Sequence, residues 1–118
     1  MSYYSNKLRI EFSNEELAKV WNKEISSWSN CFNESIIIPN NYSEKYKCWG
    51  VSEEVSIDNM SLINNSIILS FKTFKDINVP VLNQLLLDIR NDDEKASIRN
   101  LFICTDLNNR GVYHNSKV

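Results

Sequence analysis

The feature of this sequence that most limits its fold is a strand pattern followed by a helix pattern, which occurs twice. The first unit runs from Lys7 to Trp28. The second joins the apolar run Ile67–Phe74 to the segment Asn78–Ile89, and another apolar run, Leu101–Cys104, follows it. Two such units in 118 residues favour helices packed on one sheet over an all-helical or all-strand domain.

The first unit begins with strict alternation of apolar and charged residues. Leu8, Ile10 and Phe12 share one face of the segment, and the charged residues between them share the other, which predicts a half-buried strand. Ser13 and Glu16 have the spacing of a capping box, so we expect a helix capped by Ser13 that runs to about residue 29. The predicted apolar stripe of this helix is Leu17, Val20, Trp21, Ile25 and Trp28.

The second unit has the clearest strand of the chain, with Ile67, Leu69 and Phe71 on one face. A turn is expected before it at Asn64-Asn65. Pro80 lies in the first turn of the following helix, where its missing N–H costs nothing, and Asp76 or Asn78 is the expected cap. The predicted buried stripe of this helix is Leu82, Leu85, Leu86 and Ile89.

The remaining segments are read by composition. Residues 91–94 are expected to form a solvated acidic loop, Ser97–Thr105 the last strand, and residues 106–114 a turn-rich tail. Cys48–Val51 and Glu54–Ile57 resemble strand fragments. The order strand, helix, strands, helix, strand predicts an α+β fold: a ferredoxin-like two-layer sandwich with two helices on one face of an antiparallel sheet. Residues 1–118 would form this single domain.

Composition excludes several classes of protein. The net charge is −2 and the pI about 5.4, so the overall basic footprint of a duplex-binding protein is missing. Cysteines at 31, 48 and 104 are odd in number and widely spaced, which indicates a reducing compartment with thiols packed as small apolar groups. No signal peptide and no run long enough for a membrane span occurs, so we expect a cytoplasmic protein without a membrane partner.

No motif for catalysis or metal binding stands out. The three cysteines and His114 form no closely spaced ligand pair, and two glycines are too few for a phosphate-binding loop. Acidic clusters at residues 15–16, 53–54 and 92–94 could supply acid/base pairs or Mg²⁺ ligands, but the first is attributed to helix capping and the last to the solvated loop. We therefore expect a protein with no cofactor, no metal and no enzymatic activity.

Loop aromatics and nearby basic residues are the candidate binding residues. They could anchor a protein interface, stack on a single nucleic-acid strand, or close one end of the core. The candidate partner-binding residues are Tyr42, Lys45, Tyr46, Lys47, Trp49 and Arg110.

Three segments resemble a family of small ferredoxin-like proteins carried by plasmids and prophages, the YubB type. They are Tyr46–Gly50, which ends in Trp-Gly, Phe71–Leu85, with its Pro-opened helix, and Ile103–Gly111. The resemblance implies the fold and a mobile-element origin. It implies no catalytic residues. Separately, the many Asn, Ile and Lys residues are typical of A+T-rich genomes, such as those of low-GC bacteria and their phages.

The resulting hypothesis is a non-enzymatic protein of a phage or mobile element that binds a host protein. A defence effector is the most concrete host partner, which would make the chain an inhibitor such as an anti-CRISPR. The alternative is a single-stranded nucleic-acid-binding module that uses the sheet face and the basic aromatic loop.

Overall fold

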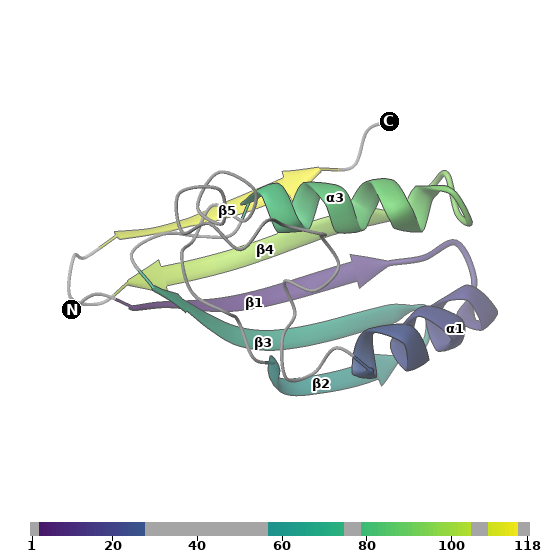
Figure 1. Ribbon diagram of the computed structural model, residues 1–118, viewed down its shortest axis with the longest axis horizontal. Helices are drawn as coiled ribbons and strands as arrows, with labels where there is room; N and C mark the ends of the chain where they lie inside the picture. Colours follow the sequence, from purple (N-terminus) through teal and green to yellow (C-terminus); the bar gives the residue numbers. More distant parts are fainter. Residues whose placement is uncertain (1–2, 28–56, 75–78, 105–108, 116–118) are drawn as a thin grey trace, which may run out of the picture.

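The computed structural model describes residues 3–27, 57–74, 79–104 and 109–115, which form five strands and two helices. These are β1 (Tyr3–Glu11), α1 (Glu15–Ser26), β2 (Ile57–Ile63), β3 (Ser66–Phe74), α3 (Val79–Arg90), β4 (Ser97–Cys104) and β5 (Asn109–Asn115). The strands form one antiparallel sheet in the order β2-β3-β1-β4-β5 (Figure 1). The first four strands have the ferredoxin-like order, so the predicted fold class is confirmed, and β5 is added beside β4.

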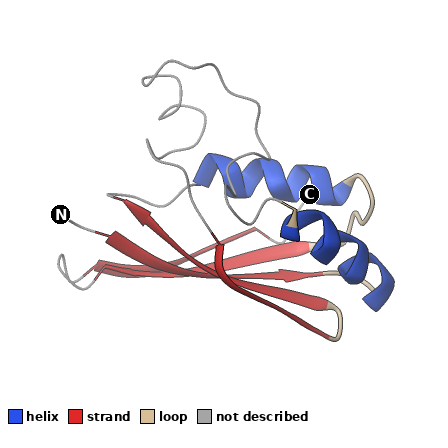
Figure 2. Cartoon of the chain, turned by 60° about the horizontal axis from the view of Figure 1, so that its bottom comes forward, coloured by secondary structure: helices blue, strands red, loops and turns tan. Residues whose placement is uncertain are grey.

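Both helices cover the same face of this sheet (Figure 2). α1 lies against β2 and β3, and α3 lies against β4. The opposite face carries neither helix, and we call it the open face. Within the described ranges, neither α1 nor α3 is long and apolar enough to span a membrane.

The core lies between the sheet and the helices and follows the predicted alternation. On β1, Leu8 pairs with Leu69 of β3, and Ile10 pairs with both Ile67 of β3 and Ile98 of β4. Each of these apolar side chains is at most 2% exposed, and full burial of such a side chain contributes about 1.5–3 kcal/mol. The predicted stripe of the second helix is confirmed as core: Leu82, Leu85, Leu86 and Ile89.

The β2–β3 hairpin confirms the predicted turn and adds an unpredicted strand. Asn64 has a φ of 55°, a left-handed conformation that asparagine tolerates better than most residues. The sequence predicts a strand fragment that ends at Ile57, whereas β2 begins at Ile57. The polar residues of β2 and the irregular pairing with β3 between Ile57 and Asn59 interrupt the apolar alternation by which a strand is recognised in a sequence. The predicted fragment 48–51 and residues 54–56 of the next one lie outside the described residues.

The first helix begins differently from the prediction. Asn14, not Ser13, is the N-cap, because Asn14 Oδ1 accepts a hydrogen bond from the Leu17 amide at 2.9 Å. Ser13 instead contacts Asp93: its amide donates to Asp93 Oδ2 at 2.7 Å, and its hydroxyl donates to Asp93 Oδ1 at 3.0 Å. The predicted capping box is therefore wrong, and so is the prediction that residues 91–94 are wholly solvated, since Asp93 is only 5% exposed.

The buried stripe of α1 is also narrower than predicted. Ala18 and Ile25 are fully buried, whereas Val20 is 61% exposed, so its assignment to the core is wrong. At about 100° per residue, Val20 lies roughly 200° around the helix from Ala18. Trp21 is half-buried, and its Nε1 donates to Asp92 Oδ2 at 3.0 Å. The helix ends at Ser26, and Trp28 lies outside the described residues.

The prediction that residues 106–114 form a turn-rich tail is wrong from Asn109 on, because Asn109–Asn115 form β5. Gly111 pairs with Phe102 of β4, and the ring of Phe102 lies over it: a Cβ on Gly111 would come within 2.7 Å of Phe102 Cζ. Phe102 in turn meets the ring of Tyr4 edge-on, at a centroid distance of 5.9 Å. An aromatic ring that covers a strand glycine replaces the packing that the glycine lacks.

Candidate functional site

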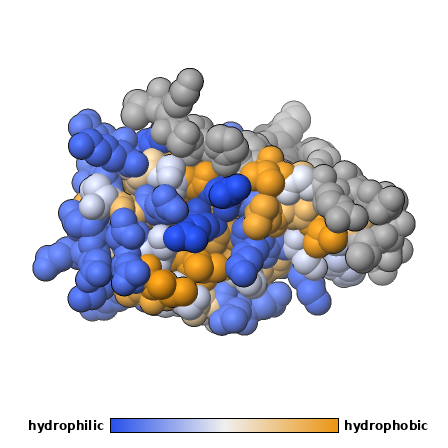
Figure 3. Space-filling view, turned by 180° about the vertical axis from the view of Figure 1, so that it is seen from behind, coloured by the Kyte–Doolittle hydropathy of each residue, from blue (hydrophilic) through white to orange (hydrophobic). Residues whose placement is uncertain are grey.

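The open face is built by the residues that alternate with the core. It receives the odd-numbered residues of β1 and β4 and the even-numbered residues of β3. Figure 3 views the molecule from behind and shows apolar groups lying among polar ones on this face. A face that water alone covers is normally polar, so these apolar groups are the feature to explain.

A hollow of about 600 Å³ lies on this face and is lined by residues of all five strands. Its apolar part is an aliphatic cluster that we define as Leu101, Ile103 and Val112, which are 45%, 40% and 47% exposed. Leu101 pairs directly with Val112 across β4 and β5. The two aliphatic side chains of β4 are therefore continuous with that of β5, and together they present one apolar surface to solvent.

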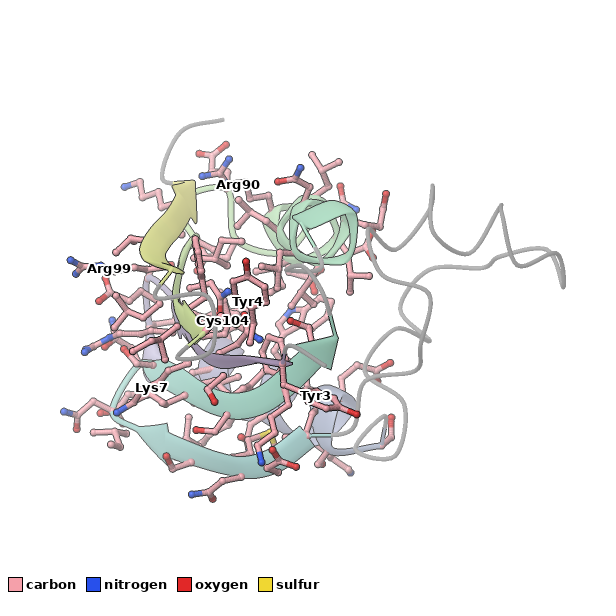
Figure 4. The ribbon with its side chains drawn as sticks, turned by 90° about the vertical axis from the view of Figure 1, so that its left-hand side faces the viewer. Tyr3, Tyr4, Lys7, Arg90, Arg99 and Cys104 are labelled. Carbon is pink, nitrogen blue, oxygen red and sulfur yellow. The ribbon has the colours of Figure 1, made fainter. Side chains whose placement is uncertain are left out.

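Basic residues surround the aliphatic cluster. We define the basic rim as Lys7, Lys72 and Arg99, all exposed. Both lysines line the hollow. Lys7 pairs with Leu101 of β4, and Lys72 of β3 pairs with Ser5. Figure 4 shows Lys7 and Arg99 projecting from the side of the sheet opposite the helices. Within the described part of the chain, no residue of the basic rim forms a salt bridge.

Arg9 and Arg99 lie directly opposite each other on β1 and β4. Like charges at directly opposed positions of a sheet destabilise it. The Nε of Arg9 contacts Glu11 Oε1 on its own strand at 3.1 Å, and its Nη2 donates to Ser66 Oγ on β3 at 3.4 Å. This exposed ion pair offsets the charge of Arg9, while no carboxylate of the described residues pairs with Arg99.

Most of the predicted site residues lie outside the described part of the chain. These are Tyr42, Lys45, Tyr46, Lys47 and Trp49. Arg110 is in β5, and its backbone pairs with Ile103 of the aliphatic cluster. The structure thus places the backbone of one predicted residue beside the hollow and leaves the other five predictions untested.

Sequence reasoning missed the aliphatic cluster although a signal was present. In β4, Ile98 and Cys104 alternate with Leu101 and Ile103, so both faces of the strand are apolar. A strand that is apolar on both faces is typical of a sheet covered on both sides. Only one side of this sheet is covered by the described helices, and that combination singles out the open face.

A second polar feature is buried on the helix side. Asn100 Nδ2 donates to Asn6 Oδ1 at 2.9 Å, and Asn6 Nδ2 donates to Thr73 Oγ1 at 3.0 Å, which links β4, β1 and β3. All three side chains are at most 4% exposed. Among the described residues, Asn100 Oδ1 accepts no hydrogen bond. These amides link strands inside the core.

The other reactive groups that the structure describes lie apart from one another. Cys104 is fully buried, as predicted for a thiol that packs as a small apolar group. Within residues 3–27, 57–74, 79–104 and 109–115, no three His, Cys, Asp or Glu side chains are grouped so that they could hold a metal ion.

Comparisons of this chain with known sequences found no match, and a comparison with solved structures found weak similarities. No family model matches the sequence, and no curated protein matches it. One similar chain comes from a solved structure of A. aeolicus tRNASec in complex with M. kandleri SerRS, with 8% sequence identity and a TM-score of 0.44. The match covers 86% of this chain and 20% of that chain. A de novo designed protein with a ferredoxin fold is similar at 13% identity and a TM-score of 0.40, over 100% of this chain and 87% of that one. Similarity this low says nothing about function.

Proposed function

We propose that this protein is a small binding protein that docks on a partner protein through its open face. The observation that carries the proposal is the aliphatic cluster, which is solvent-exposed, contiguous and set in a hollow. Contiguous apolar patches rimmed by polar residues mark interaction sites in soluble proteins. Apolar side chains at the centre with charged residues around them also match the arrangement of protein interfaces.

A protein partner fits this face better than a single nucleic-acid strand. Strand binding relies on aromatic rings on which bases stack. Tyr4 and Phe71 are buried on the helix side, and the ring of Phe102 packs against Tyr4 and Gly111. Among the described side chains of the open face, Tyr3 at the start of β1 is the one aromatic residue.

The basic rim favours a nucleic acid as the second candidate, because Lys and Arg neutralise phosphates. The two candidates differ in their dependence on salt. Binding of a single-stranded oligonucleotide would weaken steeply between about 50 mM and about 200 mM salt, and it would tolerate loss of the aliphatic cluster. Binding of a protein through the aliphatic cluster would not tolerate that loss.

The biological setting belongs to the same proposal. The resemblance to plasmid and prophage proteins supports a mobile-element origin, and the abundance of Asn, Ile and Lys fits the A+T-rich genome of a low-GC bacterium or its phage. On that basis the partner is a host protein, and a defence effector such as a CRISPR nuclease is the first to assay. Inhibition of such an effector would follow from occupation of one of its working surfaces, without chemistry by this chain.

The test is capture of host proteins by immobilised wild type and variants, followed by calorimetry with the purified partner. The double variant Leu101→Ser/Ile103→Ser should weaken binding at least about tenfold, which corresponds to about 1.4 kcal/mol. Val20→Ser is the matched control, since Val20 is 61% exposed but lies on α1, on the opposite side of the sheet from the hollow. Thermal unfolding of each variant establishes that it is folded.

A parallel set of truncations tests the sequence-derived site. Tyr42→Ala, Tyr46→Ala and Trp49→Ala should each be compared with the open-face double variant. If the three truncations abolish binding and the double variant retains full affinity, docking through the open face is rejected and the loop residues carry the function. If each truncation costs less than about 1 kcal/mol, the three loop aromatics are not the anchors.

A further inference from the structure

We infer that the segment which occupies the open-face hollow is acidic: an aliphatic or aromatic anchor in the aliphatic cluster, flanked by carboxylates that reach the basic rim. This inference rests on the proposed docking function and specifies its partner.

The first argument is the segregation of charge in the described structure. α1, α3 and the loop 91–96 together carry seven carboxylates and four basic side chains. The open face shows the opposite balance, with Lys7, Arg9, Lys72 and Arg99 against Glu11 and Asp58. The face is therefore positive in a protein whose net charge is −2. Oppositely charged surfaces steer association and set its specificity.

The second argument is that two facing arginines destabilise the sheet of the free protein. Arg99 faces Arg9 across two central strands, and within the described residues no carboxylate pairs with Arg99. An arrangement that destabilises the isolated sheet becomes favourable when an anionic group lies over it. A guanidinium also binds carboxylates in a bidentate manner, which adds geometric specificity.

The third argument is the proximity of the cations to the apolar anchor site. Lys7 is the direct cross-strand neighbour of Leu101, and such neighbours have Cβ atoms about 4.5–5.5 Å apart. Residues next to an anchor along an extended segment lie about 3.3 Å away per step. Carboxylates one or two positions from the anchor therefore fall within reach of the lysine and arginine side chains.

A second copy of this chain is a poorer occupant. A two-fold contact would bring each basic rim against its own equivalent, because the same patch faces itself. Asp58 lines the hollow, but Glu11 is already paired with Arg9. Self-association through this face would therefore bury more positive than negative charge.

The experiment uses three synthetic peptides and the full chain labelled with ¹⁵N. The peptides share one leucine-rich centre and are flanked by glutamates, by glutamines or by lysines. The glutamate peptide should shift the amide signals of β1, β4 and β5 around the hollow and bind about tenfold more tightly than the glutamine peptide. Raising the salt from about 50 mM to about 200 mM should reduce that advantage, since the charges are exposed. The lysine peptide should bind most weakly.

Charge reversal gives the matched variants. Lys7→Glu/Arg99→Glu should invert the order, so that the lysine peptide binds more tightly than the glutamate peptide. Lys19→Glu, an exposed change on α1, should leave the order of wild type. Equal binding of all three peptides to wild type overturns the acidic partner while leaving docking at the aliphatic cluster intact.

Two further outcomes also overturn the inference. One is the absence of signal shifts with the glutamate peptide at millimolar concentration. The other is an oligothymidylate that shifts the same amides when the glutamate peptide does not, which would assign the face to a nucleic acid. The docking function itself is judged separately, by the effect of Leu101→Ser/Ile103→Ser on capture of the host partner, so the two failures are distinguishable.

Discussion

Replacement of Asp93 by alanine should be among the most destabilising changes outside the apolar core. Asp93 is 5% exposed and accepts three hydrogen bonds: from the Ser13 amide at 2.7 Å, from the Ser13 hydroxyl at 3.0 Å and from the Lys95 amide at 3.2 Å. Since Ser13 is 80 residues away, these contacts join the β1–α1 connection to the loop after α3.

The expected magnitude follows from the two amide donors. A hydrogen bond to a charged group contributes about 1.5–3 kcal/mol, and we take the lower value for each amide because Ser13 and Lys95 are exposed to water. The serine hydroxyl can turn to solvent and adds little. Asp93→Ala should therefore lower the free energy of unfolding by about 3 kcal/mol. Glu94→Ala, an exposed neighbour, should change it by less than about 0.5 kcal/mol.

Urea denaturation followed by circular dichroism measures both variants, and an unchanged m-value supports comparison of the midpoints. A double-mutant cycle with Ser13→Ala measures only the coupling through the Ser13 hydroxyl, which should be small because alanine keeps the amide that donates to Asp93. If Asp93→Ala lowers the free energy of unfolding by less than about 1 kcal/mol, then the hydrogen bonds that Asp93 accepts do not hold these segments together.

Three further predictions concern stability. Leu85→Ala should lower the free energy of unfolding by about 2–5 kcal/mol, because Leu85 is fully buried. Leu87→Ala should have little effect, because Leu87 is 61% exposed on the same helix. Urea midpoints that fall equally in the two variants would contradict the packing of α3. Asn14→Ala should lower the free energy of unfolding by about 1 kcal/mol as the loss of an N-cap, and Glu16→Ala, which removes the side chain that a capping box needs, should lower it by less; the reverse order in thermal unfolding would restore the capping box. Gly111→Ala should cost about 1–3 kcal/mol, because the added methyl group overlaps the ring above it, and an unchanged melting temperature would refute that contact.

Most of the fold could be predicted because its signals are local. Alternation in Leu8, Ile10 and Phe12 and helical spacing from Leu82 to Ile89 both report burial directly, and the structure confirms both. The prediction failed where a residue's partner is distant in sequence. Ser13 has the pattern of a cap, but Asp93 supplies a better acceptor for its amide, and the cap passes to Asn14.

The candidate site could not be predicted in the same way. Aromatic and basic residues in loops drew attention to residues 42–49, whereas Leu101 and Val112 look like ordinary strand residues. They form one surface only because β5 pairs beside β4, and a segment that contains Gly111 gives little sign of a strand. The basic rim likewise depends on which residues of β1 and β3 face each other.

What the sequence determined by itself is therefore the set of elements and the side of each element that is buried, because periodicity acts within a few residues. The tertiary structure decided which buried sides meet, that β5 extends the sheet, and that one face keeps an apolar hollow within a basic rim. Those outcomes depend on strand order and register, which join residues as distant as Lys7 and Leu101 and which no local pattern contains.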